Sequence, residues 1–228
     1  MKKITIAITG ASGVIIAFEL LRYLLQLNIH FAKNNSDASS IQSSNQSSAQ
    51  LVTIHLVISK AGIITISEEL GLSLSNNPNI IREKIIEYFA LQNDIDFCAN
   101  NFFVYQNNDW FTPIASGSNV DDAMVVCPCS MATLARIANG LGEDLIARAC
   151  DVIIKERKNL ILVPRETPFS AIHLENMLKL SKLGVAIVPP IPAFYNHPKS
   201  IADVINFIVA RILDQLNIKN TISPRWET

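Results

Sequence analysis

Short runs of β-branched and aliphatic residues alternate along this chain with longer stretches of helical periodicity. Five runs have the length and composition of buried strands, at residues 4–9, 53–59, 123–127, 160–164 and 185–189. Helical periodicity occupies residues 14–27, 145–157, 173–184 and 200–216. An alternation of strand and helix predicts a parallel sheet that is covered by helices. The pattern therefore favours an α/β fold over an all-β or all-helical one.

Length and composition favour one large domain over two small ones. The chain has 228 residues, of which 49% are apolar and 17% are charged, which is enough for one substantial core. We therefore expect a single domain over residues 1–228. Nineteen basic against twenty acidic residues give a net charge of -1. That balance provides no large positive field, so we expect neither a nucleic-acid partner nor an anionic membrane surface.

The N-terminus and the cysteines indicate the compartment. The apolar run in residues 1–13 is interrupted by Thr9, Gly10 and Ser12, which makes it too short for a secretory signal. No apolar run approaches the roughly 18 residues that a membrane span needs. The four cysteines, at positions 98, 127, 129 and 150, have no regular spacing, so a disulfide framework is not expected. We expect a soluble cytoplasmic protein.

Residues 33–50 break the alternation. They are almost all Ser, Asn, Gln and Ala, and such a composition buries too little apolar surface to offset its ordering entropy. We expect a low-complexity surface insertion without chemistry of its own.

A glycine-rich turn follows the first predicted strand. Gly10 and Gly13 flank Ala11 and Ser12, and the helix is expected to open at Val14. Gly10 suits a tight or positive-φ turn and Gly13 a close backbone approach, and the first N–H groups of the helix would face a phosphate or a substrate. Two glycines at this spacing after a strand indicate a phosphate site less strongly than the full GxGxxG fingerprint of dinucleotide-binding proteins does. A tight turn that binds nothing is the alternative.

The segment Cys127-Pro128-Cys129-Ser130 ends another predicted strand. Two thiols without a nearby histidine or third cysteine are a poor metal site, so we expect both cysteines to be inert and packed. Ser130 and Thr133 stand at the spacing of a helix N-cap and its first turn. Ligands of open α/β sheets bind at the carboxyl ends of the strands, so this turn and the first one could share one anionic, planar ligand.

Four charged residues follow in the next segment. Arg148 and Lys155 are seven residues apart and share one helical face. Arg165 and Glu166 come directly after the strand at 160–164, at the same sheet edge as both turns. An arginine there can hold a phosphate with two hydrogen bonds, and a glutamate beside it can move a proton. Taken alone, Tyr195 and Arg211 would be assigned to packing and to the surface.

Taken together, these segments closely resemble one family, the UbiX-type flavin prenyltransferases, formerly described as 3-octaprenyl-4-hydroxybenzoate carboxy-lyases. The resemblance covers nearly the whole chain apart from the Ser/Asn/Gln segment. The matching stretches are residues 9–14, 58–62, 106–118, 127–135, 147–180, 192–216 and 224–226. Seven segments in register are far more specific than any single motif.

The resemblance implies a fold and a reaction. Members of the family have a flavodoxin-like, Rossmann-like doubly wound parallel α/β domain and form homo-oligomers, commonly dodecamers, with active sites at subunit junctions. They join a dimethylallyl group, supplied as dimethylallyl phosphate in bacterial members, to N5 and C6 of reduced FMN. The resulting prenylated FMN serves UbiD-type decarboxylases, as in ubiquinone biosynthesis. No metal is implied, and the enzyme is not itself a decarboxylase.

The resemblance also assigns roles to residues. For FMN it implies contacts from Gly10, Ala11, Ser12, Ser59, Ser130, Met131, Ala132, Thr133 and Arg165. For dimethylallyl phosphate it implies Tyr195 and Arg211, reaching in from neighbouring subunits, with Lys155, Trp110 and Arg148. Glu166 matches the proton-handling acid of the family, Glu69 matches a second acidic site residue, and Ser12 and Lys155 complete the catalytic set.

Two alternatives stay open on the sequence. One is an FMN-dependent cysteine decarboxylase of the phosphopantothenoylcysteine type, which shares the fold. Such enzymes are expected to carry a catalytic histidine soon after the first helix, and His55 instead lies within a predicted strand, where a packed core histidine is expected. The other is a non-catalytic flavin-binding protein.

Overall fold

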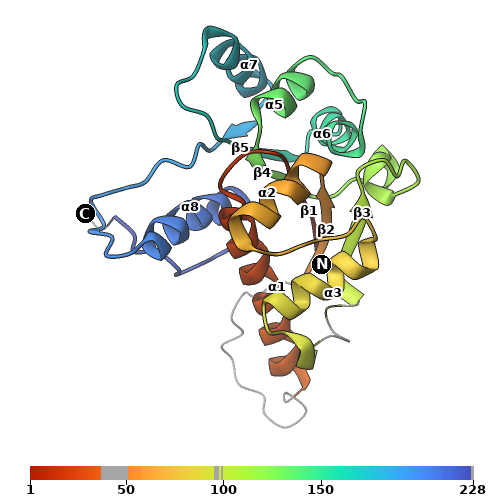
Figure 1. Cartoon of the computed structure of the whole chain (residues 1–228), viewed down its shortest axis with the longest axis vertical. Coiled ribbons are helices and arrows are strands. Elements are labelled where there is room, and N and C mark those ends of the chain that lie inside the picture. Colours follow the sequence, from red (N-terminus) through yellow and green to blue (C-terminus); the bar gives the residue numbers. More distant parts are fainter. Residues whose placement is uncertain (37–50, 95–97, 99, 227–228) are drawn as a thin grey trace.

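The computed structural model describes residues 1–36, 51–94, 98 and 100–226. They form one six-stranded sheet in the order β3-β2-β1-β4-β5-β6, in which every pair of neighbours is parallel (Figure 1). The strands are β1 (Lys2–Ile8), β2 (Val52–Ile58), β3 (Phe102–Gln106), β4 (Ala123–Cys129), β5 (Asn159–Pro164) and β6 (Ala186–Ile187). The expected doubly wound parallel fold is confirmed, and the strand order reverses between β1 and β4, where such folds bind ligands.

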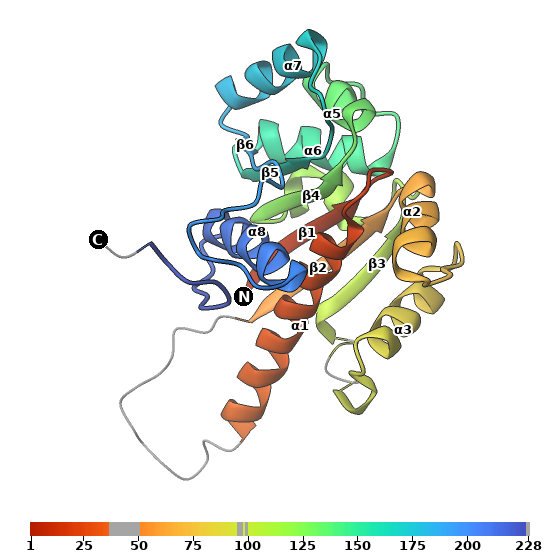
Figure 2. The same ribbon diagram turned by 60° about the vertical axis from the view of Figure 1, so that its left-hand side comes forward.

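Helices cover both faces of this sheet. They are α1 (Val14–Ser36), α2 (Lys60–Leu70), α3 (Pro78–Tyr88), α5 (Met131–Ala138), α6 (Leu145–Lys155), α7 (Ala171–Lys182) and α8 (Ile201–Gln215). Short 3-10 turns lie at η2 (Gln92–Asp94), η3 (Pro113–Ala115) and η4 (Gly117–Asn119). Figure 2 shows α5, α6 and α7 grouped beside β4 and β5, whereas α2 and α3 lie beside β3.

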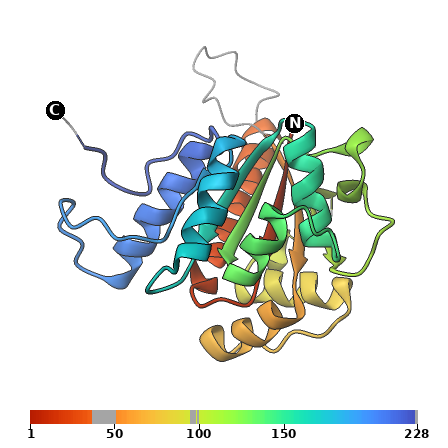
Figure 3. The same cartoon turned by 90° about the horizontal axis from the view of Figure 1, so that it is seen from above.

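Two apolar cores lie on the two faces of the sheet. Alternate residues of the central strands, such as Ile6 and Val125, join the first core with α1, α3 and α8. Their neighbours, such as Ala7 and Val126, join the second core with α5, α6 and α7. The strands are apolar on both faces because each face is covered. Figure 3, from above, shows the helical layers on either side of the strands.

Within the part of the chain that the structure describes, helix α1 is long and apolar enough over Val14–Lys33 to cross a membrane. About half of that window, 56%, is buried inside the protein. Its fully buried residues Phe18, Leu21 and Leu24 belong to the first core, and α1 packs on β1, β4 and α8. It therefore has the environment of a core helix.

The five predicted strands and four predicted helices all form, with shifted ends. Strand β3 and helices α2 and α3 are not among the predicted elements. In α2 and α3 polar residues interrupt the apolar ones, whereas β3 is a short run of only five residues. The predicted insertion begins too early, because α1 continues to Ser36. Its remaining part, residues 37–50, lies outside the described residues.

Candidate active site

The carboxyl ends of β1, β2, β4 and β5 form one edge, at which most of the predicted site residues lie. Backbone hydrogen bonds join neighbouring strand ends: Ser59 N–H donates to the Ile8 carbonyl at 2.9 Å, and Arg165 N–H donates to the Cys129 carbonyl at 3.3 Å. Serines cap the helices that leave this edge, with Ser59 before α2 and Ser130 before α5. Residues from four separate segments therefore converge here.

The turn after β1 brings its backbone close to α2. A Cβ on Gly10 would lie 2.4 Å from the Cβ of Ala61, and Gly13 has a φ of +100°. The expected roles of the two glycines are thus exchanged, since Gly10 permits the close approach and Gly13 the positive φ. Ala11 is buried, whereas Gly10 and Ser12 are exposed at the edge. Ser12 is therefore open to a ligand.

Glu69 corrects one expectation about this turn. Its carboxylate accepts hydrogen bonds from the N–H of Gly13, at 3.0 and 3.1 Å to its two oxygens, and from the N–H of Val14 at 3.1 Å. The N–H groups that open α1 were expected to face a phosphate or substrate, but they bind this side chain. A carboxylate at a helix N-terminus is stabilised by the helix dipole. Glu69 therefore lies beside Ser12, as a capping group.

Thr9 joins the turn after β1 to the turn after β4. Its hydroxyl donates to the Pro128 carbonyl at 2.8 Å and accepts from the Ser130 N–H at 2.8 Å, and its side chain is buried. This fixes the two turns on either side of the point where the strand order reverses. No sequence pattern indicates this role, since a threonine at a strand end is common.

The N-terminus of α5 presents polar groups at the same edge. Ser130 Oγ accepts from the Thr133 N–H at 3.3 Å and donates to Thr133 Oγ1 at 3.0 Å, so the predicted N-cap is confirmed. The N–H groups of Met131 and Ala132 belong to the first turn, which has no intrahelical acceptors. Met131 is half-buried and Ala132 exposed. Such a helix start suits an anionic group.

Cys127 and Cys129 are packed beneath this turn. Both are fully buried, Cys127 in the first core and Cys129 in the second, because the strand is irregular between Val126 and Cys129, where the Cys127–Pro128 peptide bond is cis. Burial raises the pKa of the Cys129 thiol to about 12 and also raises the pKa of Cys127. The thiols lie on opposite faces of the sheet and are protonated at neutral pH, as expected of inert cysteines. Among the residues that the structure describes, no group of three or more His, Cys, Asp or Glu side chains has the arrangement of a metal site.

Arg165 and Glu166 follow β5 directly and lie next to the Ser130 turn. The Arg165 backbone bonds to Cys129, and its side chain is exposed. Glu166 is half-buried and accepts a hydrogen bond from the Thr167 N–H at 3.1 Å. The predicted placement of this pair at the edge of the two turns is confirmed. It supplies a cation and a proton acceptor at one place.

Arg148 and Lys155 share a face of α6, as predicted, but Lys155, at the end of the helix, lies away from the edge. Arg148 Nε donates to the Ala115 carbonyl at 3.1 Å, and Lys155 contacts Gly117 and pairs with Glu156. Lys155 ends α6 just before β5 begins. The length of β5, about 17 Å at the usual rise per residue, therefore separates Lys155 from Arg165 within one chain.

Tyr195 and Arg211 line a pocket of about 250 Å³ beside α8. The Tyr195 ring meets the rings of Phe207 and Trp226 edge-on, with centroids 6.2 and 5.0 Å apart. Arg211 pairs with Asp214 at 2.9 Å. The residues lining this pocket do not include those of the strand-end turns. One chain therefore holds two groups of predicted site residues in separate places.

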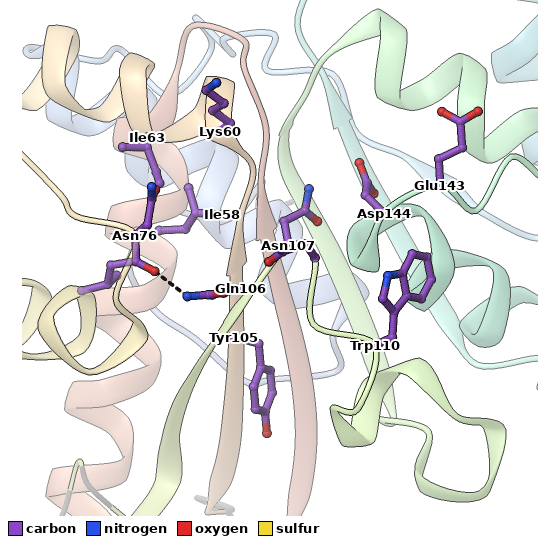
Figure 4. A pocket seen from close by; sticks show the side chains of 12 residues that line it. Ile58, Lys60, Ile63, Asn76, Tyr105, Gln106, Asn107, Trp110, Glu143 and Asp144 are labelled. Atoms are coloured by element: carbon purple, nitrogen blue, oxygen red, sulfur yellow. Dashed lines mark hydrogen bonds between the residues drawn. The ribbon is translucent and has the colours of Figure 1, made fainter.

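Trp110 lines a third place, a cavity of about 530 Å³ next to the carboxyl ends of β2 and β3. Figure 4 shows Trp110 on the side of Asp144 and Glu143, opposite Lys60 and Ile63, with the Gln106 amide bonded to the Asn76 carbonyl at 2.9 Å. Burial raises the pKa of Tyr105 in its wall to about 12, so its phenol is neutral. Trp110 is the sole predicted site residue in this wall.

His55 is buried in β2, where its Nδ1 lies 2.8 Å from an Asp121 oxygen. The same oxygen accepts from the Thr5 hydroxyl at 2.6 Å. His55 is thus a packed core histidine, as expected.

The fold and the edge site are those of a flavin-binding α/β protein, and the family model described as Flavoprotein matches residues 1–213. The flavin prenyltransferase UbiX of Methanocaldococcus jannaschii is 44% identical over 226 residues, with 99% of each chain covered. That of Pseudomonas aeruginosa is 41% identical, covering 99% of this chain and 94% of its own. The chain belongs to the UbiX-type flavin prenyltransferases.

Two solved structures agree with this assignment. A dodecameric FMN-dependent UbiX-like decarboxylase from Escherichia coli O157:H7 is 38% identical, with a TM-score of 0.74 and 99% of each chain covered. AnUbiX (PadA1), solved in complex with FMN and dimethylallyl pyrophosphate, is 36% identical, with a TM-score of 0.75 over 100% of this chain and 98% of its own.

Proposed function

We propose that the protein transfers a dimethylallyl group from dimethylallyl phosphate to N5 and C6 of reduced FMN. The observation that carries this proposal is the position of the Arg165-Glu166 pair: the Arg165 N–H donates to the Cys129 carbonyl, directly before the Ser130 turn. Thr9 joins that turn to the turn after β1, at the point where the strand order reverses. The identity to flavin prenyltransferases over nearly the full chain supports it.

The residues at the sheet edge fit FMN. Gly10 and Ser12 are exposed and Ser59 is half-buried. The opening turn of α5 adds Ser130, Met131, Ala132 and the buried Thr133. Arg165 supplies the positive charge for the phosphate of FMN, and Ala11 fixes the turn from beneath. When bound in reduced form, FMN supplies the nucleophilic atom that attacks the prenyl carbon.

Tyr195, Arg211 and Lys155, which the resemblance assigns to the donor phosphate, lie away from this edge in one chain. We propose that Tyr195 and Arg211 of one subunit complete the site of a neighbour, together with Lys155, Arg148 and Trp110. The exposure of Tyr195 and Arg211, and the length of β5 between Lys155 and Arg165, support a shared site. The protein would then act as a homo-oligomer, a dodecamer as in the E. coli relative.

The charges suit the chemistry of allylic transfer. Cleavage of the allylic C–O bond develops negative charge on the phosphate and positive charge on the prenyl carbon. Arg211, Lys155 and Tyr195 bind and neutralise the leaving phosphate, and the indole of Trp110 shields the cationic carbon. Glu166 accepts the proton that ring closure releases. Glu69 holds the Ser12 turn in place through Gly13.

We further propose that the prenylated FMN passes to a UbiD-type decarboxylase in the cytoplasm, as in ubiquinone biosynthesis. Addition of the purified product to such a decarboxylase lacking its cofactor should restore decarboxylation.

The test of transfer is anaerobic. Purified protein with FMN, dithionite and dimethylallyl phosphate should yield a flavin that is heavier by one C5 unit in mass spectrometry. An unchanged flavin mass would contradict the proposed reaction.

An Arg211→Ala variant separates the enzyme from a flavin-storage protein. It should lose prenylation and keep FMN binding, because Arg211 lies in the pocket beside α8 and not at the sheet edge. Arg22→Ala is the matched control, since Arg22 pairs with Glu19 within α1, and it should leave both unchanged. A cysteine decarboxylase is not favoured, since the curated relatives that cover nearly the full chain are flavin prenyltransferases.

A further inference from the structure

The carboxylate of Asp214 is shared by two arginines. Arg225 donates to both of its oxygens, at 2.7 and 2.8 Å, and Arg211 donates to one of them at 2.9 Å. Asn220 adds a fourth hydrogen bond at 3.2 Å. The bidentate geometry makes Arg225 the main partner of Asp214, and Arg211 a secondary one.

The C-terminal segment, residues 219–226, forms part of the same pocket as Tyr195 and Arg211. Trp226 lies edge-on against the Tyr195 ring, and Asn196 Nδ2 donates to the Pro224 carbonyl at 3.5 Å. Arg225 and Trp226 line the pocket together with Tyr195 and Arg211. The segment therefore completes the surface that carries both residues proposed to bind the donor.

The charges in this cluster decide what Arg211 can bind. Two guanidinium groups and one carboxylate leave one net positive charge. Arg211 donates one of its five side-chain N–H groups to Asp214. The remaining N–H groups can bind a phosphate. Without Arg225, the Asp214 carboxylate would keep only the Asn220 hydrogen bond on one oxygen and could pair with Arg211 more fully. The carboxylate would then compete with the phosphate for the same guanidinium.

We propose that Arg225 is a positioning residue for Arg211, which occupies Asp214 and so leaves the Arg211 guanidinium available to the donor phosphate. This inference rests on the proposed function, because it takes Arg211 to bind dimethylallyl phosphate. Arg225 acts through Asp214 and need not touch the donor.

A double-mutant cycle tests the competition. The variants are Arg225→Ala, Asp214→Asn and their combination, with Arg225→Lys to preserve the charge. Lys219→Ala is the matched control, since it removes an exposed positive charge from the same segment without contact to Asp214. For each protein, calorimetry measures the binding of dimethylallyl phosphate to the oligomer loaded with oxidised FMN, which does not turn over. Anaerobic prenylation gives kcat and KM.

Arg225→Ala should weaken dimethylallyl phosphate binding and raise KM about 5-fold, with kcat within about 2-fold. The combined variant should regain most of the affinity, because the competing charge is gone, and Arg225→Lys should lie between. The FMN affinity and the Lys219→Ala control should stay at wild-type values.

Three results would overturn the inference: unchanged donor binding in Arg225→Ala, an equal loss in Lys219→Ala, or no recovery in the combined variant. A loss of FMN affinity and thermal stability along with donor binding would also overturn it, since it would show a purely structural role. Failure of the wild-type protein to make prenylated FMN is a separate outcome that contradicts the proposed function itself.

Discussion

The hydroxyl of Thr9 accepts a 2.8 Å hydrogen bond from the backbone N–H of Ser130. The same hydroxyl donates to the Pro128 carbonyl at 2.8 Å. One buried side chain thus ties the turn after β1 to the turn after β4. The relative position of the two proposed flavin-binding turns depends on this contact.

Thr9→Val removes the hydroxyl and keeps the shape of the side chain. The Ser130 N–H then loses its acceptor, and the Pro128 carbonyl loses one of its hydrogen bonds. Loss of these bonds beneath the two turns costs about 1–3 kcal/mol. We expect the urea midpoint to fall at unchanged slope, and FMN binding to weaken. Thr65→Val is the control, because that hydroxyl bonds to the Ala61 carbonyl on the exposed side of α2. Equal destabilisation by the two variants would contradict the role of Thr9.

Gly10→Ala should disturb the first turn, because its Cβ would lie 2.4 Å from the Cβ of Ala61. Overpacking of this kind costs about 1–3 kcal/mol, and the shift of the turn should weaken FMN binding. Adding Ala61→Gly removes the opposing methyl group and should recover part of the stability and part of the FMN affinity. The recovered stability is reduced by about 1 kcal/mol, because glycine destabilises a helix. Denaturant unfolding and FMN titration measure the two effects.

Gly142→Ala is the control for this pair, because the nearest atom to its added Cβ would be 3.7 Å away. A Gly10→Ala protein with wild-type stability and FMN affinity would mean that α2 yields freely, and the close approach would then have no consequence for the site.

The positions of the strand ends were predictable from the sequence, but the side-chain hydrogen bonds that join them were not. Hydrophobic runs placed Ser130 and Arg165 after buried strands, and the rules of parallel sheets placed both at one edge. Glu69 binds the start of α1 from 55 residues further along the chain, and no periodicity encodes such a contact. The polar residues within α2 also hid this helix, since its burial depends on neighbours in space.

The donor pocket shows a different limit. Nothing local distinguishes Tyr195 and Arg211 from surface residues, and in one chain both are indeed exposed. The resemblance alone singled them out. Asp214 and Arg225 escaped notice because they are eleven residues apart and meet only when the chain folds back after α8.

Thiol chemistry gives a third prediction. Burial raises the pKa of Cys127, Cys129 and Cys150 above the ordinary thiol value of 9.0, so at pH 8 these thiols are protonated as well as inaccessible. Cys98 is buried too. The native protein should therefore react with Ellman's reagent far more slowly than free cysteine, and all four thiols should react in guanidinium.

The Cys127→Ala/Cys129→Ala variant should keep FMN binding, because neither thiol reaches the edge. Rapid native labelling that disappears in this double variant would show one of the two thiols to be reactive, against the packing described.

Acid should release the C-terminal segment. The Arg225 guanidinium holds the pKa of Asp214 below its usual value of 3.8, with smaller contributions from Asn220 and Arg211. A carboxyl group whose pKa is lower in the folded protein stabilises the fold above the unfolded pKa, and this stabilisation is lost as the pH falls through the folded pKa. The attachment of the segment should therefore be intact above about pH 5 and should weaken below pH 3.8.

Trp226 reports this release, because its ring contacts Tyr195 in the attached state. The chain has two tryptophans, so a Trp110→Phe background isolates the signal. Fluorescence should change in the acid range, and Asp214→Asn should abolish the pH dependence. Asp203 also has a lowered pKa, from its bonds to Lys199 and Ser200, and it lines a neighbouring pocket with Pro224. An acid transition that persists in Asp214→Asn would therefore assign the release to Asp203 and contradict the role of Asp214.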